Sequence, residues 1–176
     1  MKKYILIAFL LSDIAIGKAQ TWDTIIKSNP EYRYALPGNV TQLDSLNFRL
    51  AFAFVDSMAY KVIEFVDTPL DSTNSAFISA LTETSGDTLL AVAHSLSAGG
   101  SIPIISTDSI TTFPKYEGLE VTMQYTDTAT GKVLWVYTRL FLSVHSFITF
   151  SITGEDAHLT SLLNRRDAFF NSINLQ

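Results

Sequence analysis

The chain of 176 residues contains no cysteine and few charged residues. The lack of cysteine excludes disulfides, thiolate metal sites, cysteine nucleophiles and a lipid anchor on a cysteine. Charged residues make up 16% of the chain, and 17 Asp and Glu outnumber 12 Lys and Arg for a formal net charge of −5. No cluster of basic residues is present to neutralise phosphates, so we expect no nucleic-acid partner.

The sequence motifs of common catalytic and cofactor sites are also missing. There is no Gly-x-Ser-x-Gly, no Ser-x-x-Lys, no Walker loop and no dinucleotide-binding glycine pattern. The three histidines, His94, His145 and His158, do not have the spacing of metal ligands. We therefore expect no catalytic, cofactor-binding or metal-binding residues and a protein that is not an enzyme. A hydrolase whose residues come together only in the fold is an alternative.

The first 19 residues differ from the rest of the chain. Lys2 and Lys3 precede an apolar run, and Gly17-x-Ala19 fits the small-x-small rule for signal-peptide cleavage. We predict a signal peptide over 1–19, cut between Ala19 and Gln20, with an uncleaved anchor or a buried first helix as the alternatives. The run is shorter than the ~20 apolar residues of a membrane span. The prediction is thus a periplasmic or secreted protein with no permanent span and a single domain over 20–176.

Apolar residues at every second position predict antiparallel strands. Phe48, Leu50, Phe52 and Phe54 would share one face of a strand, with Arg49, Ala51 and Ala53 on the other. The segment 58–66 would be the next strand of a hairpin, although a short helix capped by Ser57 also fits. The segments 32–36, 116–126, 133–142 and 147–153 are predicted as further strands.

Two segments have the spacing of helices. Leu89, Val92, Ala93 and Leu96 indicate a helix within 71–100, and an amphipathic helix capped by Asp156 is expected near the end of the chain. Its inward stripe is Leu159, Leu162, Leu163, Arg166, Phe169, Phe170 and Ile173. Because the strand over 133–142 is apolar on both faces, we predict an α+β fold in which an antiparallel sheet is sandwiched between helices in three α/β/α layers.

Four stretches carry a resemblance to a known family. They are "YALPG", "YEGLEVTMQY", the hairpin "VLWVYTRLFL–SVHS–FITFSI" and the closing helix "LLNRRDAFFNSINL". Together they resemble the PsbP-like superfamily, in particular its exported bacterial members. The resemblance implies an α/β/α sandwich, no enzyme activity, and a role as a scaffold, an assembly factor or a binding module.

Arg139 is a lone cation in the strand over 133–142. A turn over 126–132 would place Leu119 opposite Arg139 and Glu117 diagonal to it. Arg139 could then bind an anionic ligand or partner, with Glu117 and His145 nearby. Alternatively it pairs with Glu117 or another carboxylate while its stem covers apolar surface, and we favour this structural interpretation.

Asp followed by Ser or Thr occurs eight times in the chain. Seven of these pairs precede an aliphatic residue, Met, Ala or Thr, which resembles a bacterial O-glycosylation acceptor. The acceptors would be Thr24, Ser45, Ser57, Ser72, Thr88, Ser109 and Thr128. The preference of both residue types for turns and caps explains the pairs equally well.

These patterns favour a non-catalytic exported domain that binds a protein, a glycan or another component of the cell envelope, with no cofactor. The alternative from another class is a carrier of a small molecule or lipid. Its pocket would be lined by Phe48, Phe52, Phe54, Trp135, Tyr137 and Phe141, unless these residues simply fill the core.

Overall fold

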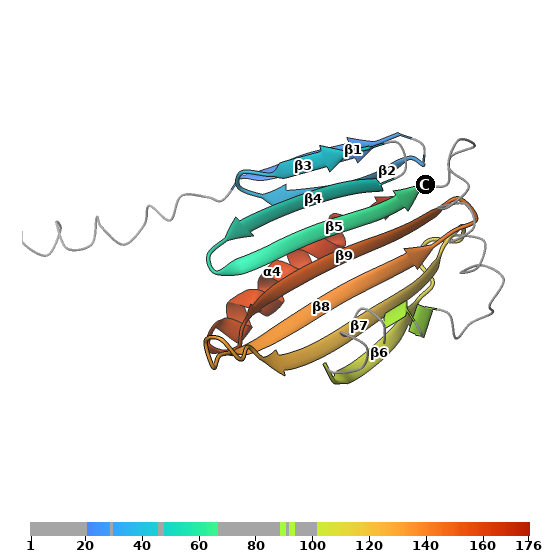
Figure 1. Ribbon diagram of the computed structural model, residues 1–176. Helices are drawn as coiled ribbons and strands as arrows, with labels where there is room; N and C mark the ends of the chain where they lie inside the picture. The colour runs from blue at the N-terminus through green and yellow to red at the C-terminus, as the bar shows by residue number, and fades with distance from the viewer. Residues whose placement is uncertain (1–20, 29, 46–47, 67–88, 91, 94–101) are drawn as a thin grey trace, which may run out of the picture.

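The computed structural model describes residues 21–28, 30–45, 48–66, 89–90, 92–93 and 102–176. Within them, the body of the protein is a seven-stranded antiparallel sheet (Figure 1). In spatial order its strands are β3 (Thr41–Asp44), β4 (Phe48–Val55), β5 (Met58–Val66), β9 (Ser146–Glu155), β8 (Val133–Leu142), β7 (Glu117–Thr126) and β6 (Ile104–Ile110).

A small second sheet and a helix pack on one face of the large sheet. The small sheet has the order β1 (Trp22–Lys27), β2 (Tyr32–Pro37) and β10 (Asn174–Leu175), and the helix α4 spans Leu159–Asn171. In Figure 1, α4 lies behind β5 and β9. The sequence had indicated the strand over 32–36 but not the second sheet, whose strands are only two to six residues long.

The β4–β5 hairpin is closed by a two-residue turn. Asp56 and Ser57 both have positive φ, 52° and 63°, which is the conformation of the turn that best matches the twist of paired strands. The strand prediction for 58–66 is therefore confirmed, and the alternative of a short helix capped by Ser57 is wrong.

The β7–β8 hairpin has a longer turn with Gly131 at φ 70°, as expected. The N–H of Asp127 donates to the carbonyl of Lys132, and its carboxylate accepts from Ala129 N and Thr130 Oγ1. The turn thus begins at Asp127, and Thr126 pairs with Val133. The predicted register is wrong by one residue, because the prediction assigned Thr126 to the turn. As a result Arg139 lies opposite Glu120, and not opposite Leu119.

Phe150 on β9 is at the centre of the main core. Its ring centroid lies 5.5–6.4 Å from those of Tyr32, Tyr34, Phe141 and Phe169, which come from β2, β8 and α4. Burying aromatic rings of this size is a large favourable contribution to folding, and edge-to-face contacts add to it. One side chain thereby connects the large sheet, the small sheet and the helix.

The inward stripe predicted for the last helix is confirmed for Leu162, Phe169 and Phe170, which are buried. Ile173 is buried as well, but it lies beyond the end of α4 at Asn171. The predicted cap is wrong. A 3-10 turn (Asp156–His158) precedes α4, and no side chain caps either one. The carboxylate of Asp156 instead accepts a hydrogen bond of 2.7 Å from Trp135 Nε1, so it is not available to the helix.

The opposite face of the large sheet is covered only in part by the described residues. Residues 89–90 and 92–93 are helical, and Leu89 and Ala93 pack against a second core cluster that includes Val121, Leu140 and Phe147. The rest of the helix predicted within 71–100, with Leu96, lies outside the described residues. The fold is dominated by its sheets and the three-layer sandwich is not confirmed, because α4 is the one long helix that the described residues show.

The face of β4 that carries the small residues is buried, and the face that carries the large aromatic residues is exposed. Ala51 and Ala53 are buried, whereas Phe52 and Phe54 are 44% and 71% exposed. The small sheet packs over β4 and fills that side with Tyr34 and Leu36, so only small side chains fit beneath it. The idea that Phe52 and Phe54 simply fill the core is therefore wrong.

Gly154 on β9 lies close against Leu162 of α4. A Cβ atom there would lie 3.0 Å from Leu162 Cδ1 and 3.3 Å from Met58 Cγ. We expect Gly154→Ala to lower the free energy of unfolding by about 1–3 kcal/mol through overpacking. In a Leu162→Ala background the same change should cost less, because the added methyl has room. Urea denaturation checks this, and an equal cost in both backgrounds would contradict it.

Candidate functional site

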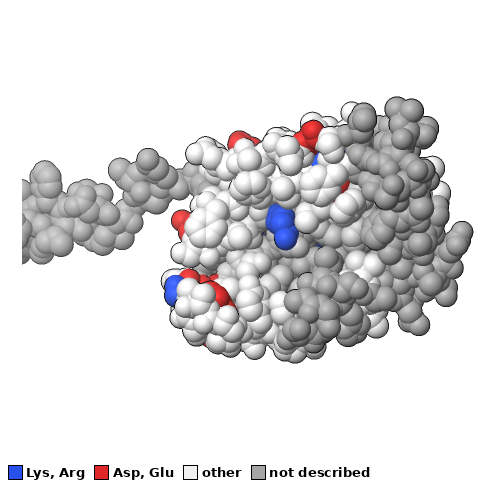
Figure 2. Space-filling model, in the orientation of Figure 1, with Lys and Arg blue, Asp and Glu red and all other residues white. Residues whose placement is uncertain are grey.

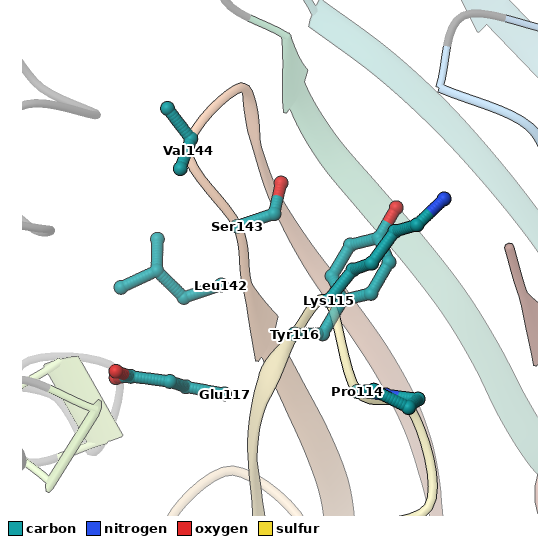
Figure 3. Close-up of a pocket in the computed structure, with 7 residues that line it drawn as sticks. All are labelled: Pro114, Lys115, Tyr116, Glu117, Leu142, Ser143 and Val144. Carbon is teal, nitrogen blue, oxygen red and sulfur yellow. The ribbon is translucent and has the colours of Figure 1, made fainter.

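A hollow lies at one end of the large sheet, between the start of β7 and the turn that joins β8 to β9 (Figure 3). It has a volume of about 350 Å³ and is lined by Pro114, Lys115, Tyr116, Glu117, Leu142, Ser143 and Val144. A second hollow of about 410 Å³ shares Pro114, Tyr116 and Glu117 with it. Of the residues singled out from the sequence, Glu117 lines both hollows, and His145 lies in the adjoining turn.

The polar groups of that turn are used by the turn itself. Ser143 N donates to Ser146 O at 2.9 Å, and the Ser143 hydroxyl accepts from the backbone N–H groups of His145 and Ser146. Burial raises the pKa of Tyr116, which favours its neutral phenol. The hydrogen bonds of Ser143 thus hold the turn that borders the hollow.

Arg139 does not belong to this hollow, since it lies on the opposite face of the sheet from Glu117. Its Nε donates to Glu120 Oε2 at 2.7 Å, and its guanidinium lies 4.5 Å from the centre of the Phe170 ring. The expected pairing with Glu117 is wrong, because the register places Glu120 opposite Arg139. The structural interpretation holds with a different carboxylate, and a ligand contact by Arg139, Glu117 or His145 stays a prediction.

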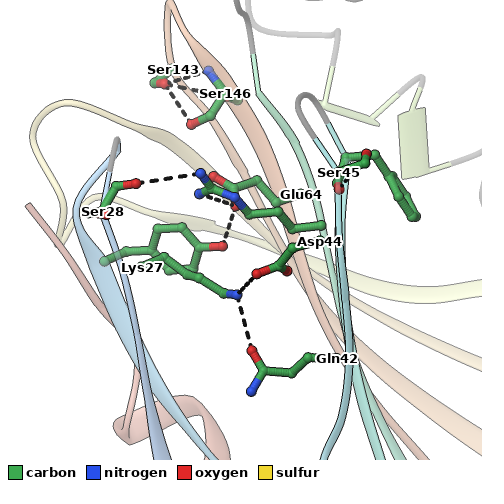
Figure 4. Close-up of polar contacts among 11 residues, drawn as sticks. Lys27, Ser28, Gln42, Asp44, Ser45, Glu64, Ser143 and Ser146 are labelled. Atoms are coloured by element: carbon green, nitrogen blue, oxygen red, sulfur yellow. Dashed lines mark hydrogen bonds and ion pairs between the residues drawn. The ribbon is translucent and has the colours of Figure 1, made fainter.

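A buried polar cluster around Glu64 was missed in the sequence (Figure 4). Glu64 Oε2 accepts hydrogen bonds from the hydroxyl of Tyr32 and from Arg49 Nη1, the latter at 3.1 Å. Nearby, Lys27 Nζ donates to Asp44 Oδ2 at 2.7 Å and to Gln42 Oε1 at 3.1 Å. The cluster thus joins β5 to the small sheet.

The carboxyl of Glu64 is fully buried, and its Oε1 has no hydrogen-bond partner among the described residues. Burial raises the pKa of Glu64, and the hydrogen bonds from Tyr32 and Arg49 offset only part of that rise. The signal for the pair was present in the sequence: a two-residue turn at Asp56-Ser57 puts Arg49 opposite Glu64. The burial could not be foreseen, because it depends on the small sheet.

Part of the large sheet is open on the side away from α4. We call open face the side chains of Leu43, Leu50, Phe52, Phe54, Ala59, Lys61 and Ile63, which alternate with residues buried against the core. Leu43 and Phe54 are 59% and 71% exposed. Figure 2 shows this side: a basic group lies near the middle of a largely uncharged surface, with acidic groups towards its rim.

A shallow groove continues the open face across β9 and β8. Its volume is about 230 Å³, and it is lined by Ala59, Lys61, Ile63, Met123, Val136, Thr138, Thr149, Ser151 and Thr153. The hydroxyls of Thr138 and Ser151 are hydrogen-bonded to each other at 3.0 Å. The groove therefore combines apolar side chains, paired hydroxyls and one ammonium group.

Five of the seven suggested glycan acceptors are described, and all five are exposed: Thr24, Ser45, Ser57, Ser109 and Thr128. Ser72 and Thr88 lie outside the described residues. Asp127 binds within its own turn and Asp56 accepts from Arg165, so turn and packing roles account for these two carboxylates. Exposure is compatible with glycosylation, which stays a prediction.

The described residues carry neither a metal-ligand cluster nor a membrane-spanning helix. No group of three or more His, Asp or Glu there could hold a metal ion. No helix in this part of the chain has the length and apolar character to cross a bilayer. The proposed signal peptide and its cleavage between Ala19 and Gln20 lie outside the described residues.

The raised pKa of Glu64 predicts a pH dependence of stability. A carboxyl whose pKa is higher in the folded state stabilises the fold below its ordinary pKa, and this contribution is lost as the pH rises through the folded-state value. Relative to Glu64→Gln, the natural protein should gain stability between pH 8 and pH 4. Relative to Asp127→Asn, the natural protein should instead lose stability as the pH falls below the ordinary value of 3.8, because hydrogen bonds from Thr130 and Ala129 lower the pKa of Asp127. Chemical denaturation at several pH values tests both, and parallel profiles would contradict the assignment.

The contacts of Arg139 predict coupled effects on stability. Its ion pair with Glu120 is partly exposed, so we expect Arg139→Met and Glu120→Gln each to cost about 1 kcal/mol. The double variant should lose less than the sum, because both changes remove the same ion pair. Arg139→Lys keeps the charge and serves as control. Thermal unfolding with strictly additive losses would show that the pair contributes nothing.

Comparison with known proteins was informative only at the level of structure. No protein-family model matches the chain, and no curated protein matches it by sequence. The crystal structures of PA94, a protein of unknown function from Pseudomonas aeruginosa, and of LpqN, involved in cell envelope biogenesis of Mycobacterium tuberculosis, give TM-scores of 0.42 and 0.45. Their identities are 10% and 9%; the match covers 88% of this chain and 97% of PA94, and 97% of this chain and 96% of LpqN.

The solution structure of the cyanobacterial PsbP, CyanoP, from Synechocystis sp. PCC 6803 is more similar. Its TM-score is 0.58 at 9% identity, over 92% of this chain and 96% of CyanoP. At this identity the likeness concerns the fold alone. The chain has a PsbP-like fold.

Proposed function

We propose that the protein is a non-catalytic, exported binding module of the cell envelope, and that it binds a protein partner through the open face. The observation that carries the proposal is the exposure of Phe52, Phe54 and Leu43 on adjacent strands. Exposed apolar side chains that are contiguous usually mark an interaction surface, whereas scattered ones do not. The signal sequence expected over 1–19 supports an envelope location.

The exposed residues are contiguous because strand pairing brings them together. Leu43 pairs with Leu50, which in turn lies opposite Ile63, while Phe54 lies opposite Ala59. Cross-strand neighbours are about 4.5–5.5 Å apart at Cβ, so their side chains form one continuous apolar surface. Such a surface is broad and shallow, which suits another protein better than a small ligand.

The carrier alternative loses support from the placement of its aromatic residues. Tyr137 and Phe141 are buried beneath α4, whereas Phe52 and Phe54 point to the opposite side of the sheet. These rings therefore do not line a common pocket. The hydrolase alternative gains no support from a specific observation, since the titratable residues brought together on the sheet, such as Arg139–Glu120 and Lys132–Glu155, form ion pairs.

The double variant Phe52→Ser/Phe54→Ser tests this function. Both side chains are exposed, so we expect little change in unfolding and a loss of at least about tenfold in binding of the envelope partner. The measurement is capture by the tagged mature protein from the envelope of the cells that produce it, with quantification of each captured protein.

Ile26→Ser is the matched control, because Ile26 is 70% exposed but lies on β1 of the small sheet. A partner specific to the open face should be captured by Ile26→Ser and lost by the double variant. Equal capture by both variants would refute the proposal.

A further inference from the structure

Lys61 is at the centre of the open face and has apolar and hydroxyl neighbours. Phe52 lies opposite it on β4, Ser151 lies opposite it on β9, and Ala59 and Ile63 flank it along β5. Its side chain is exposed, and no ion pair or side-chain hydrogen bond joins it to any part of the chain that the structure describes. The hydroxyl of Ser151 is bonded to Thr138.

Most other cations on or next to the strands are paired, whereas Arg33 on β2 is exposed and lies on the small sheet, away from the open face. Lys27 lies 2.7 Å from Asp44, Arg49 lies 3.1 Å from Glu64, and Lys132 lies 2.6 Å from Glu155. No carboxylate belongs to the open face as defined here, and Glu155 at the end of β9 is already paired. An ammonium group that is covered by a partner without a carboxylate loses its water at considerable cost.

This charge distribution argues against two occupants of the face. A second copy of the chain, packed face to face, would present the same apolar residues and another lysine. The nearest carboxylates, Glu155 and Asp127 beside Phe54, are already bonded to Lys132 and within the β7–β8 turn. An anionic membrane surface is normally recognised by a cluster of Lys and Arg together, and a lone lysine on a chain of net charge −5 attracts it weakly. A different protein with one suitably placed carboxylate would give Lys61 a counterion.

Building on the proposed function, we infer that the partner presents an apolar protein surface with an Asp or Glu placed to pair with Lys61. The apolar side chains of the open face would be buried by the partner. The ion pair with Lys61 would select the partner and fix its position along the strands. Lys61 is then a specificity residue, and its contribution to binding depends on the carboxylate of the partner.

Site-specific photo-crosslinking in the producing cells tests this inference. A benzophenone analogue of phenylalanine replaces Phe54, and in the control protein it replaces Ile26. We expect an adduct from position 54 whose crosslinked peptide is apolar and contains or adjoins an Asp or Glu. Its yield should fall at least about tenfold with Lys61→Glu and persist with Lys61→Arg. Changing that partner carboxylate to Lys should restore the adduct with Lys61→Glu.

The outcomes separate the inference from the proposed function. An adduct at position 54 that is insensitive to Lys61→Glu, or that maps to a surface without a carboxylate, overturns the ion pair and leaves the binding face intact. No adduct above the level of position 26, or adducts only with lipid or with a second copy of the chain, overturns both.

Discussion

The arrangement of the protein depends on the burial of the Phe150 ring. That ring touches aromatic residues from β2, β8 and α4, so the small sheet and the helix must both lie on the same face of the large sheet. The other close contacts on this face follow from that requirement. β4 carries alanines under the small sheet, and β9 has Gly154 close against Leu162 of α4.

The polar residues are distributed in the same way. On the face covered by α4 and the small sheet, charged groups occur in pairs, such as Arg49 with Glu64 and Arg139 with Glu120. Partial or full burial makes an unpaired charge costly there. On the open face Lys61 remains in water and needs no partner within the chain. The difference between the two sides therefore reflects which of them the chain itself covers.

Much of the architecture could be predicted from the sequence. The hairpins of β7, β8 and β9 have long alternating patterns and clear turns, and the stripe of α4 places large apolar residues at helical spacing. The register of β7 and β8 was missed by one residue, because either Thr126 or Asp127 could open the turn. Only the hydrogen bonds of Asp127 distinguish the two.

The candidate site was harder to predict, for physical reasons. Both faces of β4 are apolar, so hydrophobicity alone could not tell which one is buried; the limited space under the small sheet decides in favour of the alanines. Of the small sheet, the sequence indicated only β2, and the pairing of β2 with β1 and with the two-residue β10 was not foreseen. As a result the exposed aromatics were assigned to a pocket or a core, and Lys61 was not singled out.

Buried and exposed side chains alternate along β4 and β5, and this affects how the sequences of such proteins can diverge. Every second residue maintains the fold, and the residues between them face outwards and are under no such constraint. Mutations can therefore rewrite the outer surface over evolutionary time while the inner one is retained. Two descendants of one ancestor could in this way keep the same backbone, share few amino acids and serve different interactions.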